Sequence, residues 1–201
     1  MVIILDCGIG NLKSLKNAID FLGFSNKITY SKEDIKKAKK IIFPGVGNFG
    51  KAILELKKRG IFDILKYRIK EGVPFLGICL GMQLLFEESQ ESKGIKGLGL
   101  LNGKVLKFKL KDLVIPHMGW NSIDIKVKDK ILYKIKNNSY FYFAHSYYCN
   151  PQDKDIILAT TDYGIEFASS VHKENIWAVQ FHPEKSQELG LTLLKNFLFL
   201  C

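Results

Sequence analysis

Arginine is almost absent from this basic chain. The 201 residues carry a formal net charge of +10, but of the 30 basic residues only Arg59 and Arg68 are arginine. Lysine is a hydrated point charge, whereas bidentate recognition of bases and phosphates favours arginine. Because the lysines are spread along the chain, the charge indicates a solvated surface, and we expect no nucleic-acid partner. The charge can still help an acidic partner to dock.

Long apolar runs are missing as well. The longest, at residues 41–44 and 197–200, fall far short of the about 20 residues that span a bilayer. Residues 1–6 reach an acidic side chain at once and show no basic leader of the kind that begins a secretory signal peptide. We therefore expect a cytoplasmic protein without a membrane partner.

The four cysteines have no paired spacing. Cys7, Cys79, Cys149 and Cys201 form no C-x-x-C step of a zinc or redox site. An intracellular chain keeps its thiols reduced, so a disulfide framework is not expected either. Each cysteine is interpreted alone, and we assign Cys7, Cys149 and Cys201 to packing.

In the first half of the chain, short apolar runs alternate with helical patterns. Expected strands lie at residues 2–5, 27–30, 40–43 and 73–78, and expected helices at 12–22, from 33 onward, at 53–56, 61–69 and 80–88. Alternation of this kind predicts a parallel sheet with helices on both faces.

The second half changes character. Its expected strands lie at residues 104–110, 121–127, 140–143, 156–161, 165–171 and 177–181, ahead of a final helix at 187–200. No linker is long enough to divide the chain. The sequence therefore predicts one α/β domain over residues 1–201, with three layers, a mostly parallel sheet and an antiparallel extension in the second half.

A glycine-rich loop follows the strand predicted at 40–43. Residues 45–52, G-V-G-N-F-G-K-A, almost fit two phosphate-binding patterns. The triphosphate loop needs a hydroxyl where Ala52 stands, and the dinucleotide pattern needs an acidic residue about 20 positions on, where residues 68–70 are Arg-Ile-Lys. A tight turn is the plain alternative. A third possibility is that the loop presents backbone N–H groups to a developing negative charge, as an oxyanion hole requires.

The next strand runs into G-I-C-L-G at residues 77–81. This is the spacing of a nucleophile elbow with cysteine in place of serine, a sharp strand-to-helix turn that exposes the central side chain. N–H groups at the start of the helix would stabilise a Cys79 thiolate. The alternative is a buried structural cysteine.

A cysteine nucleophile needs a base, and the chain has four histidines. His117 lies in a turn-like stretch, His145 ends an aromatic strand, and His172 precedes a predicted surface turn. His182 ends a strand and is followed by Pro183 and Glu184. Residues two apart in extended chain project to the same side, so Glu184 can reach the imidazole and act as the third member of a triad. An incidental histidine in a turn is the alternative.

Together, G-I-C-L-G-M-Q at 77–83 and Q-F-H-P-E at 180–184 resemble the class I glutamine amidotransferases. Within that class the chain resembles the glutaminase subunits of imidazole glycerol phosphate synthases. This narrower resemblance rests on residues 6–12, 44–47, 117–121, 142–147 and 181–186, and covers nearly the whole chain. One departure is Cys7, where those subunits usually have tyrosine near the face thought to meet the synthase partner.

The resemblance implies roles for individual residues. Cys79 attacks the side-chain amide of glutamine, His182 moves the proton, and Glu184 orients the imidazole. Backbone N–H groups of Leu80 and Val46 bind the oxyanion. The residues implied to hold glutamine are Gly47, Gln83, Glu91, and the backbone of Ser146 and Tyr147. For Gln83, an ordinary helix-surface amide is the alternative. No metal or organic cofactor is implied.

Free ammonia near pH 7 is mostly ammonium, which is no nucleophile, so the product must travel unprotonated to an acceptor. The resemblance implies that the acceptor site belongs to a (β/α)8-barrel cyclase, which forms a heterodimer with this chain and makes imidazole glycerol phosphate in histidine biosynthesis. Three alternatives stay open: a paralogous glutaminase that feeds a related barrel for amination of a surface-sugar precursor, a stand-alone γ-glutamyl hydrolase, and a non-catalytic binding module.

Overall fold

An eight-stranded sheet forms the centre of the computed structural model, which describes residues 1–6 and 12–201. The strand order is β2-β1-β3-β4-β13-β12-β11-β8. These strands are β1 (Val2–Leu5), β2 (Asn26–Thr29), β3 (Lys40–Gly45), β4 (Phe75–Cys79), β8 (Asp124–Ile125), β11 (Ile157–Asp162), β12 (Glu166–Lys173) and β13 (Ile176–Val179). The strands from β2 to β13 in this order are parallel, and β12, β11 and β8 continue the sheet with antiparallel pairings.

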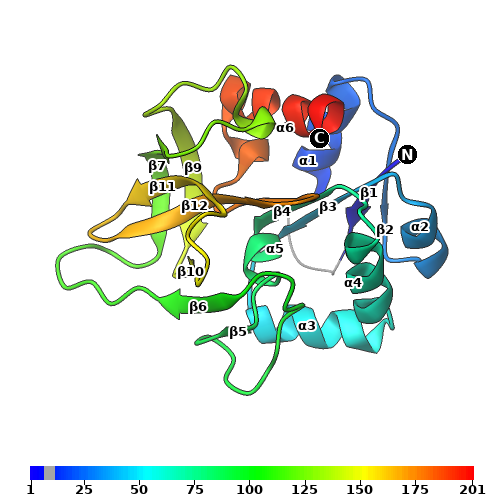
Figure 1. The fold of residues 1–201 in the computed structure, drawn as a ribbon, viewed down its shortest axis with the longest axis horizontal. Coiled ribbons are helices and arrows are strands. Elements are labelled where there is room, and N and C mark those ends of the chain that lie inside the picture. The colour runs from blue at the N-terminus through cyan, green and yellow to red at the C-terminus, as the bar shows by residue number, and fades with distance from the viewer. Residues whose placement is uncertain (7–11) are drawn as a thin grey trace.

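Helices cover both faces of the sheet, as Figure 1 shows: α1 and α6 lie on one face, and α3, α4 and α5 on the other. The helices are α1 (Leu12–Phe21), α2 (Lys32–Lys37), α3 (Phe49–Lys58), α4 (Phe62–Lys70), α5 (Leu80–Gln83) and α6 (Gln187–Leu200). The predicted fold class, a mostly parallel sheet between helices with an antiparallel extension, is therefore confirmed.

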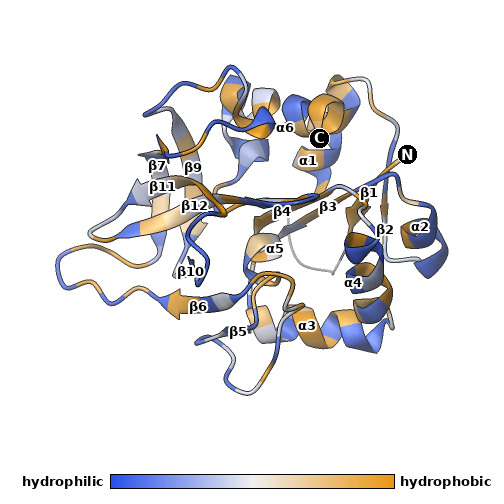
Figure 2. Cartoon of the chain, viewed as in Figure 1, coloured by the Kyte–Doolittle hydropathy of each residue, from blue (hydrophilic) through white to orange (hydrophobic). Residues whose placement is uncertain are grey.

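Two apolar cores lie on the two faces of the sheet. Ile3 and Leu5 of β1 pack into the core with α3 and α4, whereas Val2 and Ile4 pack into the core with α1 and α6. Successive side chains of a strand point to opposite faces, so a strand that is buried on both sides is apolar throughout. The central strands accordingly contain many residues coloured as hydrophobic in Figure 2.

The second half adds two smaller sheets beside the central one. One has the order β10-β6-β5 and the other pairs β7 with β9. Their strands are β5 (Glu88–Ser89), β6 (Gly103–Lys107), β7 (His117–Ser122), β9 (Tyr140–His145) and β10 (Tyr147–Pro151). The pairing of β7 with β9 places His117 directly opposite His145.

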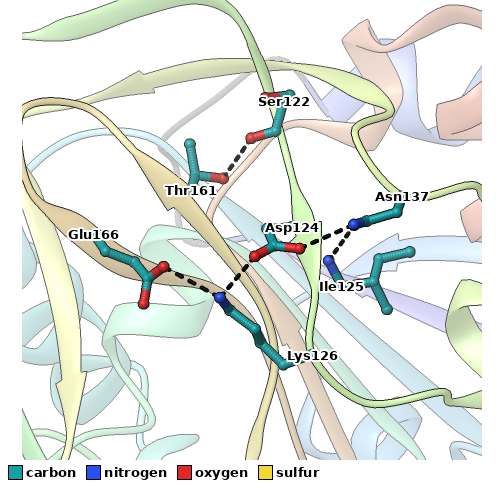
Figure 3. Close-up of polar contacts among 7 residues, drawn as sticks. All are labelled: Ser122, Asp124, Ile125, Lys126, Asn137, Thr161 and Glu166. Atoms are coloured by element: carbon teal, nitrogen blue, oxygen red, sulfur yellow. Dashed lines mark hydrogen bonds and ion pairs between the residues drawn. The ribbon is translucent and has the colours of Figure 1, made fainter.

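Polar side chains hold the short edge strand β8, as Figure 3 shows. Asn137 accepts a hydrogen bond from the Ile125 N–H at 2.5 Å and donates one to Asp124 at 3.0 Å. Lys126 forms ion pairs with Asp124 and with Glu166 of β12. An edge strand presents unpaired backbone groups, and here a side-chain amide supplies one of the missing partners.

One predicted helix is wrong. The helix expected at 80–88 ends after one turn, at Gln83, and the chain turns into β5. The carbonyl groups of Leu84, Leu85 and Phe86 accept hydrogen bonds from N–H groups of residues 98–101, so they cannot serve a continuing helix. All three side chains are also fully buried, which a one-sided helix would not allow.

Two further observations bear on the predictions. No helix among the described residues is long and apolar enough to cross a membrane. Cys7, which departs from the resemblance, lies outside the described residues, as does most of the stretch 6–12.

Candidate active site

Cys79 occupies the sharp turn between β4 and α5. Its backbone has φ 53° and ψ −104°, a conformation that non-glycine residues rarely adopt. The side chain is only 5% exposed. Such strain at a cysteine between a central strand and a helix is typical of a nucleophile elbow.

The two flanking glycines are required by the close approach of backbone at this turn. A Cβ atom on Gly81 would lie 1.8 Å from the carbonyl oxygen of Phe43 in β3, and one on Gly77 would lie 2.7 Å from the carbonyl oxygen of Gly81. No side chain fits at either position without displacing backbone. The G-x-C-x-G spacing therefore has a steric cause in this fold.

His182 follows β13 beside the elbow, because β13 is the parallel neighbour of β4. The residue is 1% exposed, and Nδ1 donates a hydrogen bond to Glu184 Oε1 at 2.7 Å. The contact that the sequence predicted is present, but its geometry differs from the prediction. Glu184 belongs to a 3₁₀ helix, Pro183–Lys185, and not to extended chain. The turn that Pro183 begins brings the carboxylate back to the ring.

Charges around His182 favour its protonated form. Burial alone lowers the pKa of His182, but the charge of the adjacent Cys79 and the Glu184 carboxylate outweigh burial and raise the pKa to about 10. The Nε2 atom is buried and has no conventional hydrogen-bond partner among the described residues. The arrangement therefore suits an imidazolium: Nδ1 is bound to Glu184, and the other ring nitrogen is left to interact with the sulfur of Cys79.

Two contacts fix the turn that carries His182 and Glu184. Ser186 Oγ donates to the His182 carbonyl at 2.7 Å and accepts the Tyr142 N–H at 3.0 Å. Gly190 of α6 packs against the same turn so closely that a Cβ atom there would lie 1.8 Å from the Pro183 carbonyl oxygen.

The glycine-rich loop lies on the other side of the elbow, since Gly45 pairs with Cys79. The first N–H groups of α3 are already bonded within the protein: Phe49 donates to Glu91, Gly50 to Ser92 and Lys51 to Asn48. These are the groups that a phosphate would use, so the phosphate-binding interpretation is not supported. The turn at Gly47, with φ +109°, is instead part of the wall of a cavity.

That cavity has a volume of about 350 Å³, within the range of about 300–1,000 Å³ for small-molecule sites, and it opens onto Cys79. It brings together, from four separate segments of the chain, every residue predicted to bind the oxyanion or glutamine: Val46, Gly47, Leu80, Gln83, Glu91, Ser146 and Tyr147. His182 and Glu184 are not among the residues that line it. Residues in the wall that the sequence did not predict are Asn48, Pro116, Met118, Ala144 and His145.

Two histidines that the sequence left without a role form a buried pair beside this cavity. His117 Nδ1 and His145 Nε2 are 3.0 Å apart, and both side chains are at most 5% exposed. Burial lowers the pKa of His117 to about 4 and that of His145 to about 3. Both are therefore neutral near pH 7. The stretch around His117 was predicted as turn-like, but it forms strand β7.

A surface turn was predicted directly after His172; residues 174 and 175 form that turn, and His172 itself is only partly exposed. It lies in β12, forms a 2.8 Å pair with Asp129 and stacks on Trp177 with ring centroids 4.5 Å apart. Within residues 1–6 and 12–201, no group of three or more acidic, histidine or cysteine side chains is arranged to hold a metal ion.

Comparison with known proteins agrees with this geometry. The model of the family "Glutamine amidotransferase class-I" matches residues 3–201. The chain therefore belongs to the class I glutamine amidotransferases. The solved structure of a glutamine amidotransferase superposes with a TM-score of 0.77 at 21% identity, covering 98% of this chain and 97% of that one.

Closer relatives are found among curated proteins. The chain is 55% identical to the imidazole glycerol phosphate synthase subunit HisH of Pyrococcus furiosus, over 98% of this chain and 97% of that protein. It is 52% identical to the protein of the same name from Methanocaldococcus jannaschii, over the full length of both.

Proposed function

We propose that this chain is the glutaminase subunit of an imidazole glycerol phosphate synthase and works in the cytoplasm as a heterodimer with a (β/α)8-barrel cyclase. The names of the full-length relatives support the assembly and the place in histidine biosynthesis. The observation that carries the chemistry is the strained Cys79 beside an imidazole that Glu184 holds at 2.7 Å.

In the proposed first step, the Cys79 thiolate attacks the side-chain carbonyl carbon of glutamine. The protonated His182 then gives its proton to the leaving amide nitrogen, and ammonia departs as the thioester forms. The raised pKa of His182, about 10, is consistent with an imidazolium that is ready to act as the acid. Water then attacks the thioester, His182 takes its proton, and glutamate is released.

The oxyanion of each tetrahedral intermediate is proposed to lie between the N–H groups of Val46 and Leu80. Leu80 is the first residue of α5, so its N–H has no partner within the helix. Val46 follows Gly45, the residue that pairs with Cys79. Both residues line the cavity at the thiol.

The amino-acid end of glutamine is proposed to bind at the far wall of the cavity. Glu91 accepts the Phe49 N–H with one oxygen and supplies negative charge for the substrate ammonium. Gly47, Gln83 and the backbone of Ser146 and Tyr147 complete this wall. Gln83 is 6% exposed, and its Nε2 donates hydrogen bonds to the Tyr147 carbonyl and to Gln180 Oε1. The alternative of a helix-surface amide is therefore not supported.

The alternatives are less well supported. The relatives named above carry the synthase name over their whole length, which favours this function over amination of a sugar precursor and over a stand-alone γ-glutamyl hydrolase. A partner that accepts ammonia directly also avoids its protonation in water.

The test combines the full-length chain with the cyclase and measures formation of imidazole glycerol phosphate from either glutamine or ammonium salt. We expect Cys79→Ala to abolish the glutamine-dependent reaction and to leave the ammonium-dependent reaction intact, whereas Cys201→Ala retains both. Glutamine-dependent synthesis by Cys79→Ala would refute the assignment of the nucleophile. Failure of the unmodified chain to support synthesis from glutamine would refute the choice of partner.

A further inference from the structure

A buried glutamine touches the reactive sulfur. The Nε2 atom of Gln180 lies 3.6 Å from Cys79 Sγ, and the Gln180 side chain is 0% exposed. Gln180 follows β13 two residues before His182, and its backbone N–H is fixed by the Ser169 carbonyl of β12 at 2.9 Å. The amide is therefore held beside the sulfur by a rigid part of the sheet.

The direction of this amide is set by a chain of hydrogen bonds that starts at the Tyr147 carbonyl oxygen. That oxygen only accepts, so Gln83 must present its NH₂ group to it, at 3.0 Å. The same NH₂ group donates to Gln180 Oε1 at 3.2 Å. The Gln180 amide then has its oxygen toward Gln83 and its NH₂ group toward Cys79. A reversed Gln180 would place two donors against each other at one end and an oxygen against the sulfur at the other.

His145 also binds the Tyr147 carbonyl, where this series of hydrogen bonds begins. Its Nδ1 donates to the same Tyr147 carbonyl at 2.8 Å, so both lone pairs of that oxygen are used. His145 Nε2 must then accept from His117 Nδ1. The Tyr147 carbonyl is thus held from two sides and is not available to reverse the Gln83 amide.

From these contacts we infer that Gln180 is a further catalytic residue, whose side-chain N–H donates to Cys79 Sγ and stabilises the thiolate that attacks glutamine. A buried thiolate is stabilised when several donors surround its lone pairs, and the Gln180 amide supplies one beside the imidazolium of His182. A neutral amide remains a donor through every step, including the departure of the thiolate when the thioester is hydrolysed.

The inference rests on the proposed nucleophile, and its test uses a readout that needs no turnover. Iodoacetamide alkylation of the peptide that contains Cys79 is followed by mass spectrometry as a function of pH, in the full-length chain. Gln180→Glu keeps the size of the side chain and an acceptor for Gln83, but it places a carboxylate where the donor was. Gln180→Met removes the donor without adding charge. Gln152→Glu, at an exposed site, is the matched control for the charge.

We expect the midpoint of Cys79 alkylation to rise by about one to two pH units in Gln180→Glu, and by less in Gln180→Met, because a hydrogen bond to a charged group is lost. In the complex with the cyclase, kcat for glutamine falls at least about tenfold near pH 7 and recovers partly at higher pH. Gln152→Glu leaves both quantities unchanged.

An unchanged alkylation midpoint in a folded Gln180→Met or Gln180→Glu protein, with a raised KM alone, overturns the inference and leaves Gln180 a support for Gln83. If Gln180→Glu fails to fold, Gln180→Met decides by the same criterion. If unmodified Cys79 alkylates normally but glutamine is not hydrolysed, the proposed function fails, and the midpoint shift still tests Gln180 separately.

Discussion

Glu184 Oε1 accepts a hydrogen bond from His182 Nδ1 at 2.7 Å, and only Pro183 separates the two residues in the chain. The carboxylate is part of a 3₁₀ turn, and the pair is almost completely buried, with side chains 2% and 7% exposed. A buried carboxylate at this distance favours the charged imidazole and fixes which nitrogen faces the thiol. Its removal should therefore change both the protonation and the orientation of His182.

Glu184→Gln tests this relationship, because the amide has the same shape and no charge. We expect the pKa of His182 to fall and kcat for glutamine to decrease by about 10- to 100-fold, with a smaller effect on KM. NMR titration of the His182 ring and steady-state kinetics measure the two effects. Glu188→Gln, an exposed carboxylate of α6, is the control. Unaltered kcat in Glu184→Gln would show that the carboxylate has no part in proton transfer.

Gly190→Ala should harm the protein although alanine is the better helix former by about 1 kcal/mol. The new Cβ atom would lie 1.8 Å from the Pro183 carbonyl oxygen and force α6 away from the turn that carries Glu184. We expect a loss of about 1–3 kcal/mol in the free energy of unfolding, measured in urea, together with a lower kcat. Lys195→Ala on the exposed side of α6 should change neither quantity. A more stable Gly190→Ala protein would contradict the packing described.

The sequence predicted the layers of the fold because its central strands and amphipathic helices follow simple periods. The apolar run at β3 and the helical pattern of α6 need only local information. The helix expected at 80–88 failed because the carbonyls of Leu84 and Phe86 are taken by the segment around residue 98, a contact that no local pattern records. Strand β10 went unpredicted for a similar reason, since it pairs with β6 about 45 residues earlier.

The parts of the candidate site that lie within short sequence motifs were predictable. The glycines at 77 and 81 and the short step from His182 to Glu184 carry steric and chemical signals within a few residues. The direction of Gln180 toward Cys79 carries no such signal, because it depends on a backbone carbonyl at Tyr147, in another sheet. Likewise, the pairing of His117 with His145 follows from the register of β7 against β9 and not from either histidine's own neighbours.

The buried His117–His145 pair should make stability fall on acidification. Both pKa values in the folded chain, about 4 and about 3, lie below the ordinary value of 6.5, so between these limits the unfolded chain binds more protons. The free energy of unfolding then decreases as the pH falls from about 6.5 toward 4, by about 1.4 kcal/mol per pH unit for each histidine. Urea unfolding at several pH values measures the slope.

His117→Phe removes one titrating ring and keeps an aromatic side chain between Phe143 and Tyr163. We expect it to reduce the slope by about half. His172→Gln should leave the slope at least as steep. Burial lowers the pKa of His172, but Asp129 outweighs burial and raises it, so His172 does not contribute to the loss of stability on acidification. An equal slope in His117→Phe and the unmodified chain would mean that His117 takes up protons in the folded state.

The polar cluster at β8 should support stability without affecting catalysis. Asn137→Ala leaves the Ile125 N–H and the Asp124 carboxylate without the amide that Figure 3 shows between them. We expect the free energy of unfolding to fall by about 1 kcal/mol, while kcat and KM for glutamine stay unchanged. Asn150→Ala, which removes an exposed amide that accepts a hydrogen bond from Lys154 at 3.0 Å, is the matched control. The strand order places β13, β12 and β11 between this edge and β4, which carries Cys79. A loss of activity without a loss of stability would therefore show that the antiparallel extension is coupled to the nucleophile through those strands, and that it does more than complete the sheet.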